Sequence, residues 1–236
     1  MERQRALITG AASGIGRALA SALVARGDDV LLVDVDAQRL AAAGRELGAR
    51  CVVGDVGERR LFEELGRIFP DPHLLCLNAG ILGRAVGHPW EVPAEDWDRV
   101  FSVNVRGVLN GLSVYVPQLT ASGEARSVLI TGSLAGLLPF PGGGAYAASK
   151  HAAAAIAEQA ALALAVTKVR VTMLCPALVR TGMSDVGVSP EAVAADALEA
   201  VSDAVFAVVP QEWHSAVQHR ASVLIAGSQP TFPTPV

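Results

Sequence analysis

The sequence predicts an α/β fold, in which a doubly wound, seven-stranded, mainly parallel sheet has helices on both faces. Short apolar runs alternate with longer helical stretches along the 236 residues. The runs are rich in Val, Leu and Ile, which is typical of strands buried on both faces. Apolar residues make up 51% of the chain, enough for a core of more than one layer. Since nothing marks a linker, we expect residues 1–236 to form a single domain.

Seven apolar runs have the length of buried strands, and helical stretches lie between them. The strands are expected, in chain order, at Ala6–Thr9, Val30–Asp34, Arg50–Gly54, Leu74–Leu77, Ser127–Thr131, Arg170–Leu174 and Val205–Val209. The helices are expected at Gly14–Arg26, Ala37–Leu47, Glu58–Phe69, Glu95–Leu119, Gly144–Val166 and Pro190–Val201, with a last helix near Glu212. This alternation is the pattern of repeated βαβ units, which predicts parallel pairing.

The helix at Pro190 has the clearest start signal. Ser189 supplies a capping hydroxyl, Pro190 fits the first turn, and Glu191 places a carboxylate at the positive helix end. By contrast, the tail 229–236 contains three prolines. We expect this tail to be a flexible arm.

The helix Gly144–Val166 carries small residues on most of its faces. A helix without a clear polar face is usually covered on several sides. Burial inside one chain would explain this pattern, and so would close packing against a second copy. Because charged residues make up only 18% of the chain, we favour a homodimer or homotetramer formed through Glu95–Leu119 and Gly144–Val166.

Composition argues against several classes of partner. The net charge is −4 and no run of Lys or Arg could follow a phosphate backbone, so we expect no nucleic-acid partner. The three cysteines, Cys51, Cys76 and Cys175, lie in or beside apolar runs and are interpreted as buried thiols of a reducing compartment. No Cys or His spacing suggests a metal, and none is expected.

The beginning of the chain passes straight into the first strand without an apolar signal core. The longest apolar stretch, 151–166, is interrupted by Glu158 and Gln159, which indicates a buried helix and not a membrane span. We therefore expect a cytoplasmic protein without a membrane partner.

A glycine-rich turn, Gly10-Ala11-Ala12-Ser13-Gly14-Ile15-Gly16, ends the first strand and opens the first helix. Glycines at such a turn let backbone N–H groups approach a pyrophosphate, which also lies at the positive end of the helix. A tight βα turn without a ligand is the alternative. The position between a first strand and an amphipathic helix favours nucleotide binding.

Asp34 ends the second strand, 18 residues after Gly16. A carboxylate at this place accepts hydrogen bonds from ribose hydroxyls and repels a 2′-phosphate. No cation flanks it, since Val35 follows and Ala12 occupies the nearest position of the glycine turn. The pattern predicts NAD in preference to NADP. The alternative is a carboxylate that only terminates a strand.

Tyr146 and Lys150 lie four residues apart, and Ser133 precedes the tyrosine by thirteen. This spacing puts an ammonium and a phenol on one helix face. A free phenol titrates near ~10 and is a poor base at pH 7 unless a cation favours the phenolate. A solvated i,i+4 pair is the common alternative. Ser133 and the glycine turn favour an acid/base site instead.

Together these residues resemble the short-chain dehydrogenase/reductase family. The resemblance covers about residues 5 to 182 and rests on motifs in family order and spacing. They are Thr9-Gly10-x-x-x-Gly14-x-Gly16, Asn78-Ala79-Gly80, Asn104, Ser133 and Tyr146-x-x-x-Lys150. It implies a Rossmann-like domain and an oxidoreductase that transfers a hydride between NAD(H) and a secondary alcohol or ketone. The residues expected to line the substrate pocket, such as Leu134-Ala135-Gly136 and Phe140-Pro141-Gly142, are chiefly apolar or small and favour a small, apolar substrate.

The resemblance also implies roles for single residues. Tyr146 would be the general acid/base on the substrate oxygen, and Ser133 would hydrogen-bond that oxygen. Lys150 would lower the pKa of the tyrosine and bind the nicotinamide ribose. Asn104 would hold a water that links Lys150 to solvent.

The cofactor residues that the resemblance implies end or follow five of the expected strands or lie on the helix Gly144–Val166. They are Gly10, Ser13, Gly14, Ile15, Gly16, Asp34, Asp55, Val56, Asn78, Ala79, Gly80, Tyr146, Lys150, Pro176 and Thr181. Asp55 and Val56 would address the adenine ring, and Thr181 the nicotinamide carboxamide. Residues 182–190 would form the substrate loop.

Two features depart from the family pattern. Ala177 follows Pro176 where the family usually has glycine, and the segment after Val208 lacks the usual ending. Two other functions stay open: an epimerase or dehydratase on the same scaffold, and a non-catalytic NAD(H)-sensing interaction protein. The presence of all four residues of the proposed proton transfer, Asn104, Ser133, Tyr146 and Lys150, favours a dehydrogenase.

Overall fold

A computed structural model describes residues 3–235; residues 1 and 2 of the predicted domain and residue 236 of the predicted tail lie outside the described residues. The described residues form a seven-stranded sheet of order β3-β2-β1-β4-β5-β6-β7 in which all neighbours are parallel. The strands are β1 (Arg5–Thr9), β2 (Asp29–Asp34), β3 (Arg50–Val53), β4 (Leu74–Leu77), β5 (Arg126–Thr131), β6 (Val169–Leu174) and β7 (Ala207–Val208). The predicted fold class is confirmed.

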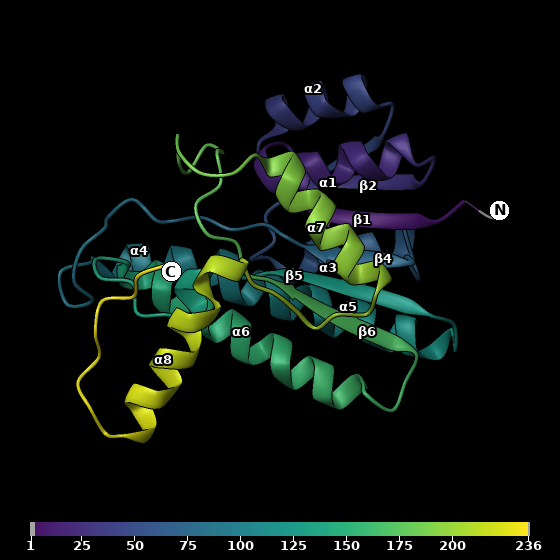
Figure 1. Ribbon diagram of the computed structural model, residues 1–236. Coiled ribbons are helices and arrows are strands. Elements are labelled where there is room, and N and C mark those ends of the chain that lie inside the picture. Colours follow the sequence, from purple (N-terminus) through teal and green to yellow (C-terminus); the bar gives the residue numbers. More distant parts are fainter. Residues whose placement is uncertain (1–2, 236) are drawn as a thin grey trace.

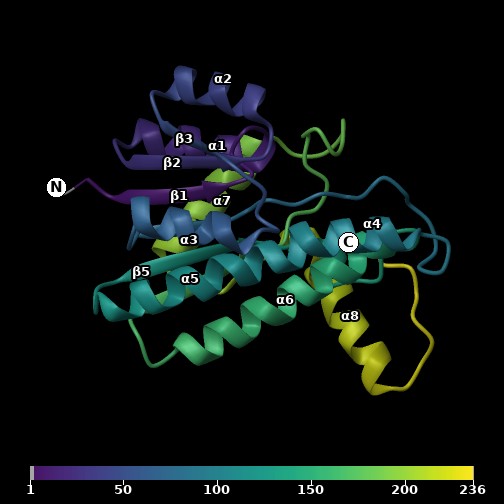
Figure 2. The same cartoon turned by 180° about the vertical axis from the view of Figure 1, so that it is seen from behind.

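Helices cover both faces of this sheet (Figures 1 and 2). They are α1 (Gly14–Ala25), α2 (Ala37–Leu47), α3 (Arg59–Ile68), α4 (Ala94–Phe101), α5 (Gly107–Ala121), α6 (Gly144–Leu164), α7 (Pro190–Ser202) and α8 (His214–Ile225). Helices α1, α2 and α7 lie on one side, and α3, α5 and α6 on the other. No helix in the described part of the chain has the length and apolarity that a bilayer crossing needs.

The core consists of one apolar cluster on each face of the sheet. Leu19 of α1 and Leu40 of α2 belong to one cluster, and Phe62 of α3 and Ala157 of α6 to the other. Neighbouring strand residues divide between them: Leu7 joins the second cluster and Ile8 the first. Since successive side chains of a strand point to opposite faces, a strand between two helix layers must be apolar throughout.

The predicted helix Glu95–Leu119 is not continuous. Helix α4 ends at Phe101, a π-helical turn spans Ser102–Arg106, and α5 begins at Gly107. The widened turn holds the buried Asn104. Its side-chain amide accepts a hydrogen bond from the Ile81 N–H and donates one to the Ile81 carbonyl. A π-turn of this kind is frequent at functional sites.

Other expectations need smaller corrections. The seventh strand has only two residues, because β6 is its sole neighbour in the sheet. Cys51 is exposed and not buried, since it lies on the edge strand β3. The last helix begins at His214, after a 3₁₀ turn. The cap at Ser189 is confirmed: its hydroxyl accepts a hydrogen bond from the Ala192 N–H at 3.2 Å.

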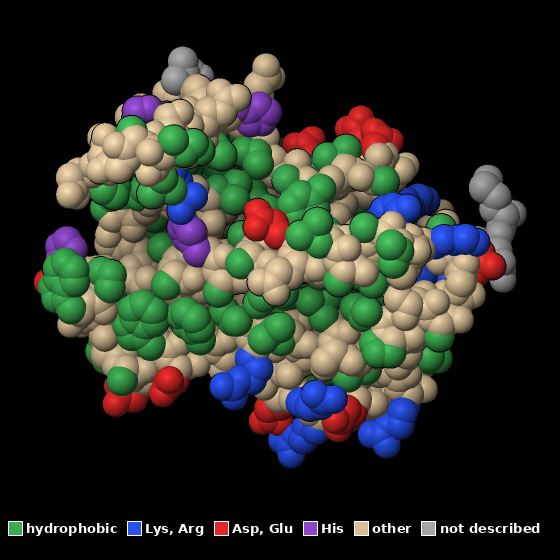
Figure 3. Space-filling model, turned by 90° about the horizontal axis from the view of Figure 1, so that it is seen from below, with side chains coloured by type: hydrophobic (Ala, Val, Ile, Leu, Met, Phe, Trp, Pro, Cys, Tyr) green, Lys and Arg blue, Asp and Glu red, His purple; other side chains and the backbone are tan. Residues whose placement is uncertain are grey.

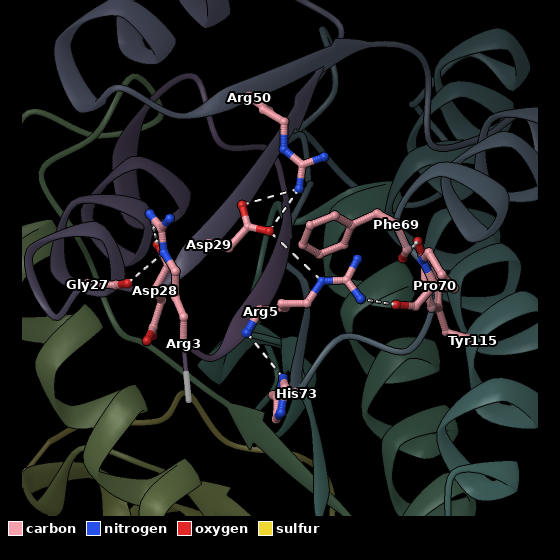
Figure 4. Close-up of polar contacts among 10 residues, drawn as sticks. All are labelled: Arg3, Arg5, Gly27, Asp28, Asp29, Arg50, Phe69, Pro70, His73 and Tyr115. Atoms are coloured by element: carbon pink, nitrogen blue, oxygen red, sulfur yellow. Dashed lines mark hydrogen bonds and ion pairs between the residues drawn. The ribbon is translucent and has the colours of Figure 1, made fainter. Parts of the chain in front are cut away.

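Charged and aromatic side chains join the strands at their amino ends (Figure 4). The Asp29 carboxylate accepts a hydrogen bond from Arg50 at 2.9 Å and lies 3.9 Å from the Arg5 guanidinium. Both guanidiniums lie over the ring of Phe69, at 4.2 Å for Arg5 and 5.0 Å for Arg50. Arg5 also donates to the Pro70 carbonyl at 2.7 Å. This end of the sheet is therefore closed by paired groups.

Candidate active site

The glycine turn lies at the opposite, carboxyl end of β1. Gly10 has φ of +68°, which favours glycine, and a Cβ on it would lie 2.9 Å from the Ala79 Cα. A Cβ on Gly16 would lie 2.2 Å from the Gly10 carbonyl oxygen. No side chain fits at either position, so the backbone folds tightly from strand to helix.

The turn leaves the first turn of α1 without a side-chain cap. Ser13 is the N-cap residue in an extended conformation, and its hydroxyl makes no capping hydrogen bond. The N–H groups that follow, at Gly14, Ile15 and Gly16, point to the positive end of the helix. These residues fit the diphosphate of a dinucleotide, which such a helix end binds through N–H groups.

Asp34 is fastened to the glycine turn. Its carboxylate accepts hydrogen bonds from the N–H of Ala12 and the N–H of Asp36, both at 3.0 Å. The half-buried side chain is thereby held at the end of β2 with lone pairs still free. It can accept hydrogen bonds from a diol placed over the turn.

Asn78 connects three strand ends. Its amide nitrogen donates to the Thr9 carbonyl at 3.1 Å, and its amide oxygen accepts from the Thr131 hydroxyl at 2.9 Å. The Thr9 hydroxyl in turn accepts from the N–H groups of Asn78 and Ala79. The sequence motif included Thr9 without giving it a role, and sequence reasoning missed Thr131, although both are the last residues of their strands, where polar side chains are unusual in a buried sheet.

Lys150 of α6 points to the same strand ends. Its ammonium donates to the Thr131 carbonyl at 2.9 Å and lies 5.8 Å from the centre of the Tyr146 ring. Burial lowers the pKa of Lys150 to about 8. Among the described residues no carboxylate forms an ion pair with it. The lysine is thus a buried cation with neutral partners.

Tyr146 and Ser133 come from neighbouring elements. Burial raises the pKa of the Tyr146 phenol, and the nearby Ser133 hydroxyl acts in the opposite direction. The Ser133 oxygen accepts a hydrogen bond from the Ala135 N–H at 3.1 Å, which leaves its own proton to be donated. The hydroxyl groups of Ser133 and Tyr146 can therefore both hydrogen-bond to one substrate oxygen.

Asn104 lies one layer behind these groups. Its amide nitrogen donates to the Ile81 carbonyl and to the Ser149 hydroxyl, both at 2.9 Å. A Cβ on Gly80 would lie 3.3 Å from the Lys150 ammonium and 3.4 Å from the Asn104 amide oxygen. Asn104 and Lys150 thus flank the same glycine. Ser149, fully buried, was missed from the sequence because it lies between the two conspicuous residues Tyr146 and Lys150.

The remaining predicted cofactor residues lie along the same edge. Asp55 accepts a hydrogen bond from the Gly57 N–H at 2.8 Å, and Val56 is buried. The Pro176 carbonyl accepts from the Leu134 N–H. Thr181 reaches over the glycine turn, since its methyl lies 3.0 Å from a Cβ built on Gly14. The arrangement brings all the predicted residues to the carboxyl ends of the strands.

Ala177, which departs from the family pattern, causes no strain. Within residues 3–235 the non-glycine residues with positive φ are Asp71 and Ala204, so Ala177 has an ordinary backbone. Its side chain packs with Leu134 and Leu138. The alanine is accommodated by this small apolar cluster.

Comparison with known proteins gives consistent results. Residues 4–191 match the family model described as short chain dehydrogenase. The 1-deoxy-11-beta-hydroxypentalenate dehydrogenase of Streptomyces exfoliatus is 37% identical over 78% of this chain and 70% of its own. The 2-(R)-hydroxypropyl-CoM dehydrogenase of Xanthobacter autotrophicus is 33% identical over 96% of this chain and 92% of its own.

Solved structures agree with these relatives. A short chain dehydrogenase/reductase from Burkholderia phymatum, in complex with NAD, superposes with a TM-score of 0.92 at 31% identity and covers 100% of this chain and 99% of its own. The chain therefore belongs to the short-chain dehydrogenase/reductase family and is an oxidoreductase that acts on CH–OH and C=O groups.

Proposed function

We propose that this protein transfers a hydride between NAD(H) and an apolar secondary alcohol or ketone, with Tyr146 as general acid/base. One observation carries the proposal: the phenol of Tyr146, the hydroxyl of Ser133 and the ammonium of Lys150 come together at the carboxyl edge of the sheet. The glycine turn, where a dinucleotide fits, is joined to them through Asn78.

In the oxidation direction, the carbinol carbon loses a hydride and the substrate hydroxyl loses its proton to the Tyr146 oxygen. The nicotinamide ring supplies the acceptor for the hydride. Ser133 donates a hydrogen bond to the substrate oxygen in both directions, so the charge that develops there is met by a fixed donor. A positioned acid/base of this kind contributes roughly 10²–10⁴-fold in rate.

Lys150 serves this proton transfer by its charge. Burial raises the pKa of Tyr146, so the phenolate needs a nearby cation at neutral pH. The Lys150 ammonium, 5.8 Å from the ring, is that cation, and it binds the nicotinamide ribose. Asn104 holds a water that connects Lys150 to solvent, next to Gly80.

The preferred coenzyme is NAD. The Asp34 carboxylate is fixed over the glycine turn, where it favours a ribose diol and repels a phosphate. The cation that comes next in the sequence, Arg39, lies 3.5 Å from Asp36 and forms an ion pair with it. A 2′-phosphate would thus meet two carboxylates.

An apolar substrate is supported by the segments that follow β4, β5 and β6. Their exposed side chains include Val86, Trp90, Phe140, Leu178, Met183, Val186 and Val188. Charged or polar side chains exposed in the same segments include Arg84, His88, Glu91, Arg180 and Asp185. The substrate loop 182–190 belongs to a short segment that is closed on itself, because the Arg180 N–H donates to the Val188 carbonyl at 2.9 Å. The two relatives named above are dehydrogenases of hydroxylated compounds by name, which supports the alcohol and ketone chemistry but not the apolar character.

Self-association is part of the proposal. Figure 3 views the molecule from the side of α5 and α6 and shows apolar side chains gathered across it. Leu109 of α5, Leu162 of α6 and Val166 after it are exposed. We propose a homodimer or homotetramer that buries this face, built from single-domain subunits. The free thiols Cys76 and Cys175 fit a cytoplasmic protein.

The test is turnover of NADH and of NADPH with a panel of 2-alkanones of increasing length. We expect consumption of NADH, a clear preference over NADPH, and a rise in kcat/KM of about two- to fourfold per added methylene while the chain stays on apolar residues. An epimerase, a dehydratase or an NAD(H) sensor would bind the coenzyme without consuming it. A preference for NADPH would refute the assignment to Asp34.

A further inference from the structure

The segment between β4 and α4, residues 78–93, borders the site and is fastened near both of its ends. Ile81 is held by Asn104, as described above. Further along, the Gly87 N–H donates to the Gly142 carbonyl at 2.9 Å, and Gly87 pairs with Gly143 in a β-bridge. Between these two points the chain needs another support if it is to keep one conformation.

Asp96, in the first turn of α4, supplies that support. Its two carboxylate oxygens accept the Arg84 N–H at 3.0 and 2.8 Å, and one of them also accepts the Ala85 N–H at 2.9 Å. The residue is only 7% exposed and, among the described residues, forms no ion pair. The backbone bonds from Ala85 and Arg84 lower the pKa of Asp96. The Asp96 carboxylate thus binds the backbone of the segment.

Gly83 shows how closely the segment fits this carboxylate. Its φ is +95°, and a Cβ on it would lie 2.7 Å from an Asp96 oxygen. A side chain would therefore need both an unfavourable backbone conformation and a shift of the carboxylate. The chain passes over Asp96 at a distance that glycine permits.

The supported segment touches the catalytic helix. Ile81 and Ala85 pack against the cluster of Val92, Val100 and Ala145. Ala145 immediately precedes Tyr146 in α6. A displacement of Ala85 therefore acts on a cluster that includes Ala145, the neighbour in α6 of the residue that we propose as the acid/base.

We propose that Asp96 is a positioning residue of the active site: it fixes residues 83–85 against α6 and so sets where a substrate lies relative to Tyr146. The proposal rests on the function proposed above. Asp96 does not touch the glycine turn, so its effect falls on the substrate and leaves the coenzyme in place. Asparagine replaces it poorly: its amide oxygen can accept both N–H groups, but its NH₂ group then lies where the second carboxylate oxygen accepts the Arg84 N–H, and the negative charge is lost.

The experiment compares Asp96→Asn with Asp98→Asn, which makes the same charge change at an exposed position two residues later. For Asp96→Asn we expect KM for the ketone to rise about tenfold or more, kcat to change less than threefold, and the Kd of NADH to stay within twofold. For Asp98→Asn all three stay within twofold. A tenfold loss in kcat with unchanged KM, or equal effects in both variants, would overturn the proposal.

Hydrogen exchange gives a readout that needs no turnover. In Asp96→Asn the amides of residues 79–93 and 140–149 should exchange faster than in Asp98→Asn, and those of α1 and the glycine turn should not. Faster exchange over the whole chain, or confined to α4, contradicts the positioning role. If the wild-type protein turns over no ketone, the proposed function fails, and exchange alone decides the role of Asp96.

A milder variant covers the case in which Asp96→Asn does not fold. Ala85→Gly removes a methyl that packs against the cluster of Val92, Val100 and Ala145, and it leaves the carboxylate intact. We expect the same pattern, a higher KM with kcat and NADH affinity preserved, at about two- to threefold. Unchanged KM in this variant would refute transmission through residues 83–85.

Discussion

The chain has two tyrosines, and they lie at opposite ends of the sheet. Tyr115 of α5 is fully buried near the amino ends of the strands, and its hydroxyl donates to the Phe69 carbonyl at 3.2 Å (Figure 4). Tyr146 of α6 is half-buried at the carboxyl ends, with Ser133 and Lys150 as polar neighbours. The same type of side chain makes a buried structural hydrogen bond at one end and is the acid/base that we propose at the other.

The two ends of the sheet differ in how their charged side chains are paired. At the amino ends each buried or half-buried charge has a partner of opposite sign, as in the pairs Arg126–Asp71 and Arg50–Asp29. At the carboxyl ends Lys150 is buried against a backbone carbonyl and forms no ion pair with a carboxylate within residues 3–235. Paired charges stabilise the fold, whereas a buried unpaired cation costs stability and is free to act on a reacting group.

The largest expected effect separates the two tyrosines by activity. Tyr146→Phe removes the acid/base and should lower kcat by roughly 10²–10⁴-fold with unchanged NADH affinity. Tyr115→Phe, the matched control, should keep kcat within twofold. Steady-state kinetics and NADH fluorescence titration measure both. Near-normal turnover by Tyr146→Phe would remove the proposed mechanism.

The second prediction concerns the unpaired lysine and pH. The pKa of Lys150 falls from its ordinary 10.5 to about 8 in the folded protein, so the unfolded chain binds more protons between these values. Stability from this group therefore rises with pH from 8 to 10.5, by up to roughly 3 kcal/mol.

Urea unfolding of the wild type and of Lys150→Met at pH 7.5 to 9.5 tests this prediction. The difference between the two proteins reports the lysine together with its electrostatic effect on Cys175, whereas the raised pKa of Cys76 affects both alike. We expect the wild type to gain stability relative to Lys150→Met as the pH rises. A constant difference would mean that the lysine keeps its ordinary pKa.

A third prediction concerns the stability contributed by Tyr115 at the amino ends of the strands. Tyr115→Phe deletes a buried hydroxyl and leaves the Phe69 carbonyl without this partner, which should lower the free energy of unfolding by about 1–2 kcal/mol. Chemical denaturation gives the value. A loss of activity without a loss of stability would contradict the assignment of this end to structure.

The smallest expected effect is that of Arg5→Met. The variant loses an ion pair with Asp29, a hydrogen bond to Pro70 and a cation–π contact with Phe69, but it retains an apolar stem; we expect about 1 kcal/mol of lost stability and unchanged kcat. Arg59→Met, at an exposed ion pair on α3, is the control and should cost at most about 0.5 kcal/mol. Equal effects in the two variants would show that stacking on Phe69 adds nothing.

Much of the fold could be predicted from the sequence because the signals are local. The strand Leu74–Leu77 and the helix Ala37–Leu47 were predicted with their bounds, since continuous apolar runs and clear helix ends depend on neighbouring residues. The π-turn at Ser102–Arg106 could not be predicted, because it depends on a bond from Asn104 to Ile81, 23 residues earlier. The exposure of Cys51 depends on strand order, which no local pattern gives.

The candidate site divides in the same way. Gly10, Asp34, Ser133, Tyr146 and Lys150 stood out from residue type and spacing, and their places in the catalytic scheme remain proposals. Thr131, Ser149 and Asp96 did not stand out, and Thr9 entered only as part of the glycine motif without a role, since a threonine, a serine or an aspartate has no distinctive chemistry until its partner is known.

The sequence by itself determined the strand and helix pattern, the glycine turn and the identity of the acid/base candidates, because each depends on residue type and on separations of a few positions. Only the tertiary structure decided that Lys150 is buried without a counter-charge and that Asp96 supports the segment beside Tyr146. Burial and hydrogen-bond partners depend on which distant segments meet, and that is a property of the packed chain.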